Sequence, residues 1–278
     1  MKLRHFALII ATLGTGACSR VTRNDDAFAW SENIPAGATV HLRDGMGNIT
    51  VNAAPGRTAS VRGALRSRRG HLDDVHFVVN RTGNDYYICA MWRNSGECNA
   101  SGYRGSSSGP WWTIFSLFHH GSDAAANITM QLPSGTAVDA RTLNGIVTID
   151  GANAGVSAHT VNGAVRASNV SGPLMLSTVN GEVRLAAATL APSDSVHLST
   201  VNGAVHAELP PNLDGEFDLS VTNGVVRNAF PIPGASISRH HISGQIGTST
   251  RVIRMHTVNG AIVIDAHPNA GPATGSIQ

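Results

Sequence analysis

Apolar and polar residues alternate along most of the chain after residue 127, which is the pattern of β-strands that bury one face. The alternation recurs around one tetrapeptide. Perfect copies of Thr-Val-Asn-Gly begin at Thr160, Thr178, Thr200 and Thr257, and near-copies begin at Thr142 and Val221. The spacings between the motif asparagines are 18, 18, 22, 21 and 36 residues. Such a period is typical of a repeat architecture.

Two columns of apolar residues flank the motif. One lies six residues before each asparagine and the other three residues after it, as in Val156 and Val165 of the second repeat. Each repeat is therefore predicted to hold two short strands hinged at Asn-Gly, a pair that tolerates positive φ. The predicted turn residues are Asn144, Gly145, Asn162, Gly163, Asn180, Gly181, Asn202, Gly203, Asn223, Gly224, Asn259 and Gly260.

The spacing decides between two all-β architectures. Asn-Gly between alternating strands also indicates β-hairpins, so a stack of antiparallel hairpins is one alternative. The even spacing favours coiling, which would place Val165 beside Val183 at about 4.8 Å. We predict an all-β, single-stranded parallel β-helix (β-solenoid) with about 18–22 residues per coil. The gap of 36 residues is expected to hold two coils, with residues 242–246 as a degenerate strand between them.

A weaker copy of the repeat lies near the N-terminus. Residues 34–50 match residues 132–148 at a constant offset of 98. We therefore expect a first solenoid segment at 31–51, an insertion with a hairpin and a Gly/Ser/aromatic loop at 52–126, the main solenoid at 127–270 and a tail at 271–278.

The N-terminus indicates export. Residues 1–17 combine basic residues, a short apolar stretch and small residues, which is typical of a secretory signal and too short to span a membrane. Residues 15–18 resemble a bacterial lipobox, so Cys18 is the predicted lipidation site and 18–30 a tether. Thr15 departs from the usual Leu or Val, which leaves plain signal-peptidase cleavage as the alternative. The lipobox resemblance, with Ser19 after the cysteine, implies sorting to the outer membrane.

The other two cysteines are Cys89 and Cys98. In an oxidising compartment this pair is expected to form a disulfide, with residues 86–92 folding back as a hairpin. A zinc site is disfavoured because two sulfurs do not fill it. The formal net charge is +2, which argues against a nucleic-acid binder.

Two candidate binding features follow from the repeat and its insertion. Coil stacking would align Arg166, Arg184, His206 and Arg227 into a basic stripe that could follow an anionic glycan, unless Glu182, Asp218 or solvent screens it. Trp111 and Trp112 open an aromatic segment that is expected to cover an exposed end of the core. A partner-binding or membrane-touching loop, or stacking on sugars, are the alternatives for that segment.

No catalytic, cofactor or metal motif is present in the sequence. β-Helical polysaccharide-active enzymes need acids on adjacent coils, whereas Asp139 and Asp218 are expected to lie several coils apart. We predict no catalytic residues, no cofactor and no metal site.

The Thr-x-Asn-Gly-x-Val series, the Leu-Pro-x-Gly-x-x-Val segment at Leu132 and the closing segment from Gly244 to Ile262 resemble the bacterial putative-adhesin family of unknown function. The resemblance implies a β-helical solenoid and supplies no ligand or catalytic residues. The predicted function is a non-catalytic outer-membrane lipoprotein that serves as a scaffold for adhesion or envelope interaction, with a membrane anchor and a glycan or protein partner. The alternatives are a binding module for an anionic glycan or lipopolysaccharide and, remotely, a polysaccharide-active enzyme.

Overall fold

The computed structural model describes residues 19–21, 27–66, 75–92, 96–100, 102–105 and 124–268. The predictions on the signal segment, Cys18, Trp111, Trp112 and the tail at 271–278 lie outside the described residues. Within the described residues the chain is all-β, and none of them forms a helix long and apolar enough to cross a membrane.

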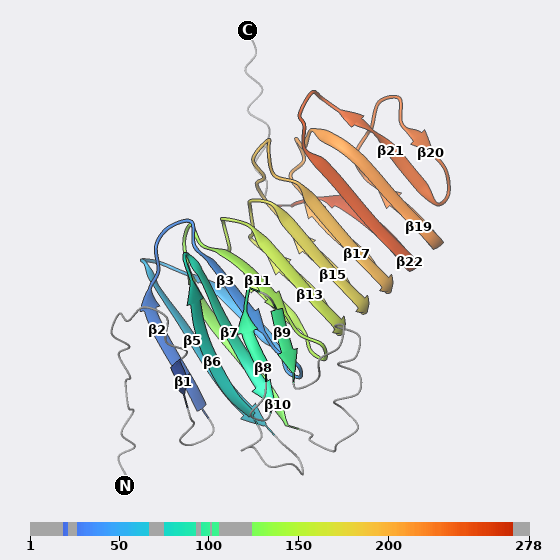
Figure 1. The fold of residues 1–278 in the computed structure, drawn as a ribbon. Helices are drawn as coiled ribbons and strands as arrows, with labels where there is room; N and C mark the ends of the chain where they lie inside the picture. The colour runs from blue at the N-terminus through green and yellow to red at the C-terminus, as the bar shows by residue number, and fades with distance from the viewer. Residues whose placement is uncertain are drawn as a thin grey trace.

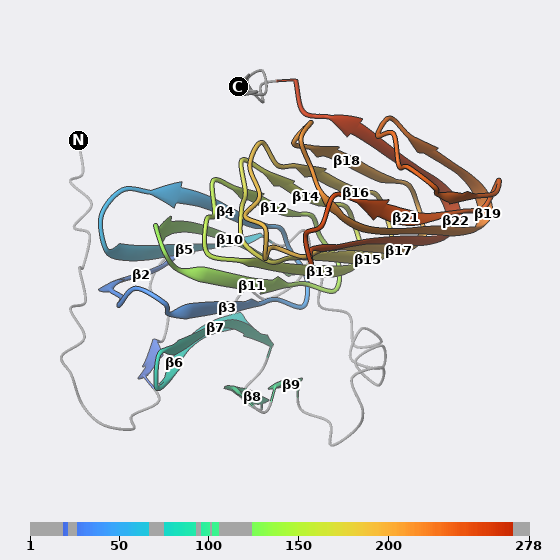
Figure 2. The same ribbon diagram turned by 90° about the horizontal axis from the view of Figure 1, so that it is seen from above.

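Each Asn-Gly motif joins two strands of one coil, and parallel stacking of coils builds two walls that meet at the motif (Figures 1 and 2). The first wall contains the strand before each motif: β3 (Thr39–Arg43), β11 (Ala137–Arg141), β13 (Val156–Asn162), β15 (Leu174–Asn180) and β17 (Val196–Asn202). The second wall contains the strand after it: β4 (Ile49–Ala54), β12 (Val147–Asp150), β14 (Val165–Ser168), β16 (Val183–Ala186) and β18 (Val205–Leu209). Two long strands, β19 (Gly215–Asn228) and β22 (Val252–Ala266), run through both walls.

The register of the walls follows the repeat. Val165 pairs with Val183, as the coiled arrangement requires. The N-terminal copy of the repeat also pairs in register. Val40 lies beside Val138 and Ile49 beside Val147, and the residues of each pair are 98 apart in sequence. The β-solenoid predicted from the spacing is confirmed.

The order of the last coils differs from the prediction. The Thr257 coil in β22 stacks directly on the β17–β18 coil, and the Val221 coil in β19 stacks outside it. β21 (His241–Ile246) is not a coil between them, because it pairs antiparallel with the first half of β19 and with β20 (Ser236–Ile237). The expectation that coils stack in sequence order is therefore wrong for the last two.

Two observations account for this order. Thr257 donates a hydrogen bond to Gly203 O at 3.0 Å, which Val221 in the same position has no hydroxyl to make. Arg251, which precedes β22 and is buried, donates to the carbonyls of Leu190, Ala191 and Asp214. It thereby holds the start of β22 between the loops that lead into β17 and β19.

The described strands of residues 52–126 extend both walls, and so do two strands that begin within the predicted tether at 18–30. In the second wall β10 (Ala125–Pro133) pairs parallel with β4 and antiparallel with β5 (Thr58–Arg66), and β2 (Ala27–Asn33) follows. In the first wall β7 (Asp85–Trp92) pairs parallel with β3 and antiparallel with β6 (Val75–Thr82), and β1 (Ser19–Val21) follows. The N-terminal end is thus a two-layer sandwich whose core includes Phe28 stacked on Phe77 at 4.6 Å.

Cys89 and Cys98 form a disulfide with Cα atoms 6.1 Å apart. The expected hairpin around them is wrong, since β7 pairs with β6 and β3, while β8 (Gly96–Asn99) pairs with β9 (Gly102–Gly105). The disulfide therefore ties the β8–β9 ribbon to the outer face of β7, where Tyr87, Met91 and Cys98 form a second small core.

Candidate functional site

The motif asparagines form a ladder along the corner between the two walls. They lie in the order Asn144, Asn162, Asn180, Asn202, Asn259 and Asn223, and from Asn162 onward each side-chain amide donates to the side-chain oxygen of the preceding asparagine at 2.8 or 2.9 Å. The threonines form a parallel ladder, since Thr160, Thr178 and Thr200 donate to motif-glycine carbonyls of the neighbouring coils. These ladders are structural features that fix the register of the coils.

The predicted positive φ occurs at Gly163, Gly224 and Gly260 but not at the other motif glycines, and a second reason applies to all six. Within the described residues the one non-glycine residue with positive φ is Asn169, so the motif asparagines do not use left-handed backbone. The close approach of neighbouring coils leaves no room for a side chain at any of them. A Cβ on Gly181 would overlap the carbonyl oxygen of Gly163 in the neighbouring coil, and every other motif glycine makes the same contact.

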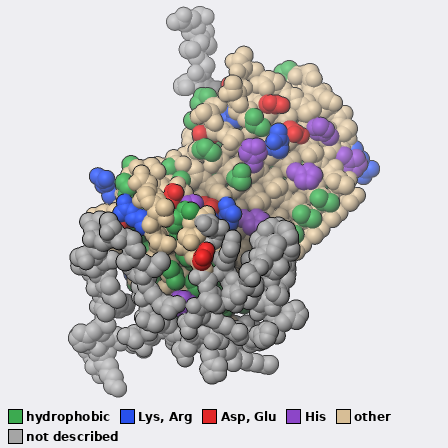
Figure 3. All heavy atoms as spheres, viewed as in Figure 1, with side chains coloured by type: hydrophobic (Ala, Val, Ile, Leu, Met, Phe, Trp, Pro, Cys, Tyr) green, Lys and Arg blue, Asp and Glu red, His purple; other side chains and the backbone are tan. Residues whose placement is uncertain are grey.

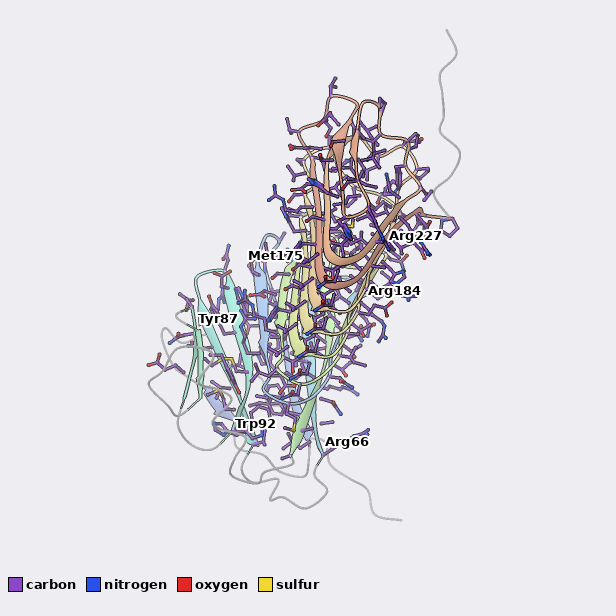
Figure 4. The ribbon with its side chains drawn as sticks, turned by 90° about the vertical axis from the view of Figure 1, so that its right-hand side faces the viewer. Arg66, Tyr87, Trp92, Met175, Arg184 and Arg227 are labelled. Carbon is purple, nitrogen blue, oxygen red and sulfur yellow. A yellow bond between two sulfur atoms is a disulfide. The ribbon has the colours of Figure 1, made fainter. Side chains whose placement is uncertain are left out.

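The predicted basic stripe lies on the outer face of the second wall (Figure 4). Arg166 pairs with Arg184 and Arg184 pairs with His206, so three of its four members are neighbours. Arg227 does not continue the stripe, because the inserted coil places Val263 between it and His206.

Acidic residues occupy the same face. Glu182 lies 2.7 Å from Arg184 and 3.6 Å from His206, and its bond with Arg184 lowers the pKa of Glu182. Glu208 and Asp265 pair in register on the neighbouring strands. Glu182 therefore offsets the charge of Arg184 directly and also interacts electrostatically with Arg166 and His206. With Arg227 separated as well, the stripe does not form an extended positive track.

The outer face of the first wall is different in kind. Across β13, β15 and β17 its outward positions carry no Asp, Glu, Lys or Arg. We call this surface the central face, and it consists of Ser157, His159, Met175, Ser177, Val179, His197, Ser199 and Val201, with Val161 buried beneath it. Met175 is 56% exposed and Val201 39% exposed. Figure 3 shows hydrophobic and histidine side chains gathered on this side of the molecule, and Figure 4 places Met175 on the face opposite Arg184.

Charged groups border the central face along the stack. On one side are Asp139 and Arg141 of β11, and on the other is the pair of Arg254 with Asp218, 3.3 Å apart. His159 lies at the edge near Arg141, accepts or donates a bond with Ser177 at 2.8 Å, and has its pKa lowered by burial.

Asp139 is the centre of a tight ionic cluster. Arg43, Arg141 and His41 all bind its carboxylate, and His41 stacks on Tyr87 at 4.5 Å. Burial alone would raise the pKa of Asp139, but the bond from His41 and the charges of both arginines hold it well below its ordinary value. A carboxylate whose two oxygens are bound by two arginines and a histidine has no free oxygen to act as a catalytic base.

Asp44 was not singled out by sequence. It occupies the threonine position of the first coil, since it lies 98 residues before Thr142, and it is 3% exposed. One carboxylate oxygen accepts from the backbone of Met46 at 3.1 Å, and Oδ2 has no hydrogen-bond partner. Burial raises the pKa of Asp44 from 3.8 to about 8, although bonds from Met46 and Gly45 oppose the shift.

Within the described residues, no group of three or more His, Cys, Asp or Glu side chains is placed to hold a metal ion. Among the predicted binding residues, Arg166, Arg184 and His206 come together, Arg227 is separated from them, and Trp111 and Trp112 lie outside the described part. Sequence reasoning missed the central face. The sequence does indicate it, because the outward positions of these three strands, which alternate with the buried apolar ones, carry no Asp, Glu, Lys or Arg.

Comparison with known proteins gives a family. The model of the family described as Toastrack DUF4097 matches residues 115–265. A solved structure titled as a putative cell adhesion protein from Clostridium sporogenes is similar, with 10% identity and a TM-score of 0.47 over 86% of this chain and 99% of its own. One titled as a putative adhesin from Bacteroides fragilis has 9% identity and a TM-score of 0.30 over 87% of this chain and 98% of its own. No curated protein matches the chain.

Proposed function

We propose that this chain, which belongs to the Toastrack DUF4097 family, is a non-catalytic outer-membrane lipoprotein whose β-solenoid is a scaffold for adhesion or envelope interaction. The observation that carries the proposal is the central face, a flat surface free of charged carboxylate and guanidinium groups in the middle of a charged rim. The partner expected on such a surface is a protein.

The composition of the central face supports this assignment. Interfaces are depleted of charge at their centre and enriched in methionine, and their rims are polar. Met175 and Val201 are exposed there, while Asp139, Arg141, Arg254 and Asp218 lie at the borders. The parallel register also makes the surface rigid, since each strand is paired on both sides. A partner can therefore bind without first ordering a loop, which lowers the entropic cost of association.

Binding of an anionic glycan or lipopolysaccharide is less well supported. The second wall has Arg166, Arg184 and Arg227 as fixed positive charges, but Glu182, Glu208 and Asp265 share that face. Polyanion binding needs a net positive field, and this face does not supply one.

The experiment on the central face uses a paired substitution. Met175→Asp with Val201→Asp introduces two charges on exposed positions of the first wall, and Thr148→Asp places one on the second wall as the matched control. Binding of the purified chain to envelope vesicles from the cells that produce it is measured by interferometry, with melting temperatures alongside. We expect at least a tenfold loss for the paired variant and no loss for the control. Equal binding by all three proteins at equal stability would reject the central face as the contact surface.

The lipid anchor is tested separately. Cells that express the chain or its Cys18→Ala variant are fed radiolabelled palmitate and fractionated. We expect label and membrane partition for the parent chain and neither for the variant. A parent chain that is unlabelled and released into the soluble fraction would refute the anchor without bearing on the central face.

A further inference from the structure

The C-terminal end of the solenoid is only half closed. β21 pairs with the first half of β19, from Gly215 to Ser220, and Val221 still bonds to His240. Beyond that point, residues 223–228 pair with β22 on one side, and within the described chain no strand pairs with them on the other. In Figure 2 β19 and β22 reach the end of the molecule together.

This open edge presents the groups that bind the next coil elsewhere in the stack. In the inner coils the N–H of the motif glycine donates to the asparagine carbonyl of the next coil, as Gly181 does to Asn202 at 3.0 Å. The N–H two residues further on donates as well, as Val183 does to Ala204 at 3.0 Å. Gly224 and Val226 are the equivalent residues of the last coil.

The side chains of the edge are equally incomplete. The side-chain amide of Asn223 donates to Asn259. In the inner coils the side-chain oxygens of Asn162 and Asn180 accept the amide of the next coil, and the oxygen of Asn223 is the equivalent acceptor. Val226 is partly exposed, whereas Val165, Val183 and Val205 in the same column are fully buried. A following strand is what supplies both the amide and the apolar cover in every inner coil.

An apolar depression adjoins the edge. It has a volume of about 370 Å³ and is lined by Asn228, Phe230, Pro231, Ile232, Ile237 and Ile242, among others. Ile237 is 72% exposed. Natural proteins usually protect open edges with charges, prolines or bulges, and the one charge on residues 223–228 is Arg227.

We propose that this edge is a second docking site, independent of the central face, that takes a parallel β-strand of the type Asn-Gly-x-Val from another protein chain. The incoming asparagine amide donates to Asn223 Oδ1, its backbone accepts from Gly224 and Val226, and its valine covers Val226 beside the depression. This is strand addition at a sheet edge, in which main-chain bonds give affinity and side-chain pockets give specificity.

The site predicts its own selectivity. A Cβ on any motif glycine overlaps the glycine carbonyl of the preceding coil, as one on Gly203 would overlap Gly181 O. An incoming strand with alanine in place of glycine would meet Gly224 O in the same way, so glycine is required at that position.

The test uses a peptide copied from the chain, residues 202–209, with a fluorescent label and blocked ends. Its binding to the full chain is followed by anisotropy beside an otherwise identical peptide that carries alanine at the Gly203 position. We expect saturable binding of the first peptide and at least tenfold weaker binding of the second.

Two protein variants locate the site. Val226→Pro removes the outward N–H donor and is placed where edge strands tolerate proline, and Ile237→Asp puts a charge at the depression without disturbing the core. We expect each to weaken binding at least tenfold, with Thr148→Asp unchanged as the control. Absence of saturable binding, equal binding of the alanine peptide, or binding insensitive to both variants would overturn the proposal. So would a dimer of the chain in sedimentation velocity that Val226→Pro dissociates, because the edge would then belong to a second copy.

Discussion

Asp44 makes this protein less stable as the pH rises, which is the opposite of the usual effect of a carboxylate. Its pKa is about 8 in the folded chain, against 3.8 without burial. Between these values the folded state holds a proton that the unfolded state has released, so unfolding becomes easier as the pH rises. Each pH unit in this window lowers the free energy of unfolding by at most ~1.4 kcal/mol. The contribution is complete below pH 4 and is lost as the pH passes through 8.

The assay is urea unfolding, followed by tryptophan fluorescence, of the parent chain and Asp44→Asn at pH 5, 6 and 7. Asparagine keeps the size of the side chain and removes the titration. We expect the parent to lose about 2–3 kcal/mol relative to the variant from pH 5 to pH 7, from two units of that slope. Other groups titrate in this range, and His159 has its pKa lowered by burial, but their effect is common to both proteins and cancels in the difference. Parallel stability curves would refute the reasoning.

Three further outcomes are expected. Gly181→Ala should destabilise the chain by more than ~2 kcal/mol, because its Cβ overlaps Gly163 O and overpacking typically costs ~1–3 kcal/mol; a smaller effect in thermal unfolding would show that coils can separate locally. Arg251→Leu should cost ~3 kcal/mol or more by leaving buried carbonyls unpaired, and hydrogen exchange should locate the loss in β19 and β22; an unchanged exchange pattern would contradict its role in holding the coil order. Asn223 should deamidate fastest of the motif asparagines in a timed peptide map at pH 8, because no described strand restrains the N–H of the following glycine; equal rates in the folded chain would count against an open edge.

The sequence predicts the stacking of the inner coils well, because their columns repeat in both polarity and spacing. Val165 and Val183 pair as expected, and so do residues 98 apart at the start. This success has a local basis, since one strand needs only its two neighbours to specify its register. The offset of 98 residues also aligns Asp44 with Thr142, so the sequence does show that an aspartate replaces a threonine of the ladder. Its burial could not be predicted, because an aspartate is normally exposed.

The order of the last coils is harder to predict, because four identical motifs carry no information on which neighbours which. The replacement of threonine by Val221 was the available signal for an end position. The reason for the motif glycine was likewise beyond the sequence, since conformational freedom and close approach both select glycine. The basic stripe could be predicted as a column of arginines at one position of the repeat. That Glu182 offsets the charge of Arg184 could not, because it depends on distances in the folded coil.

The insertion of β22 between β18 and β19 has a consequence for synthesis. A solenoid whose coils stack in chain order can grow from one end while the ribosome is still producing the rest. Here residues 215–228 emerge before the strand on which they rest, β22, so they must wait for residues 252–266. The last two coils, residues 215–266, therefore complete together rather than one after the other, and a chain truncated before residue 252 would lose two coils rather than one.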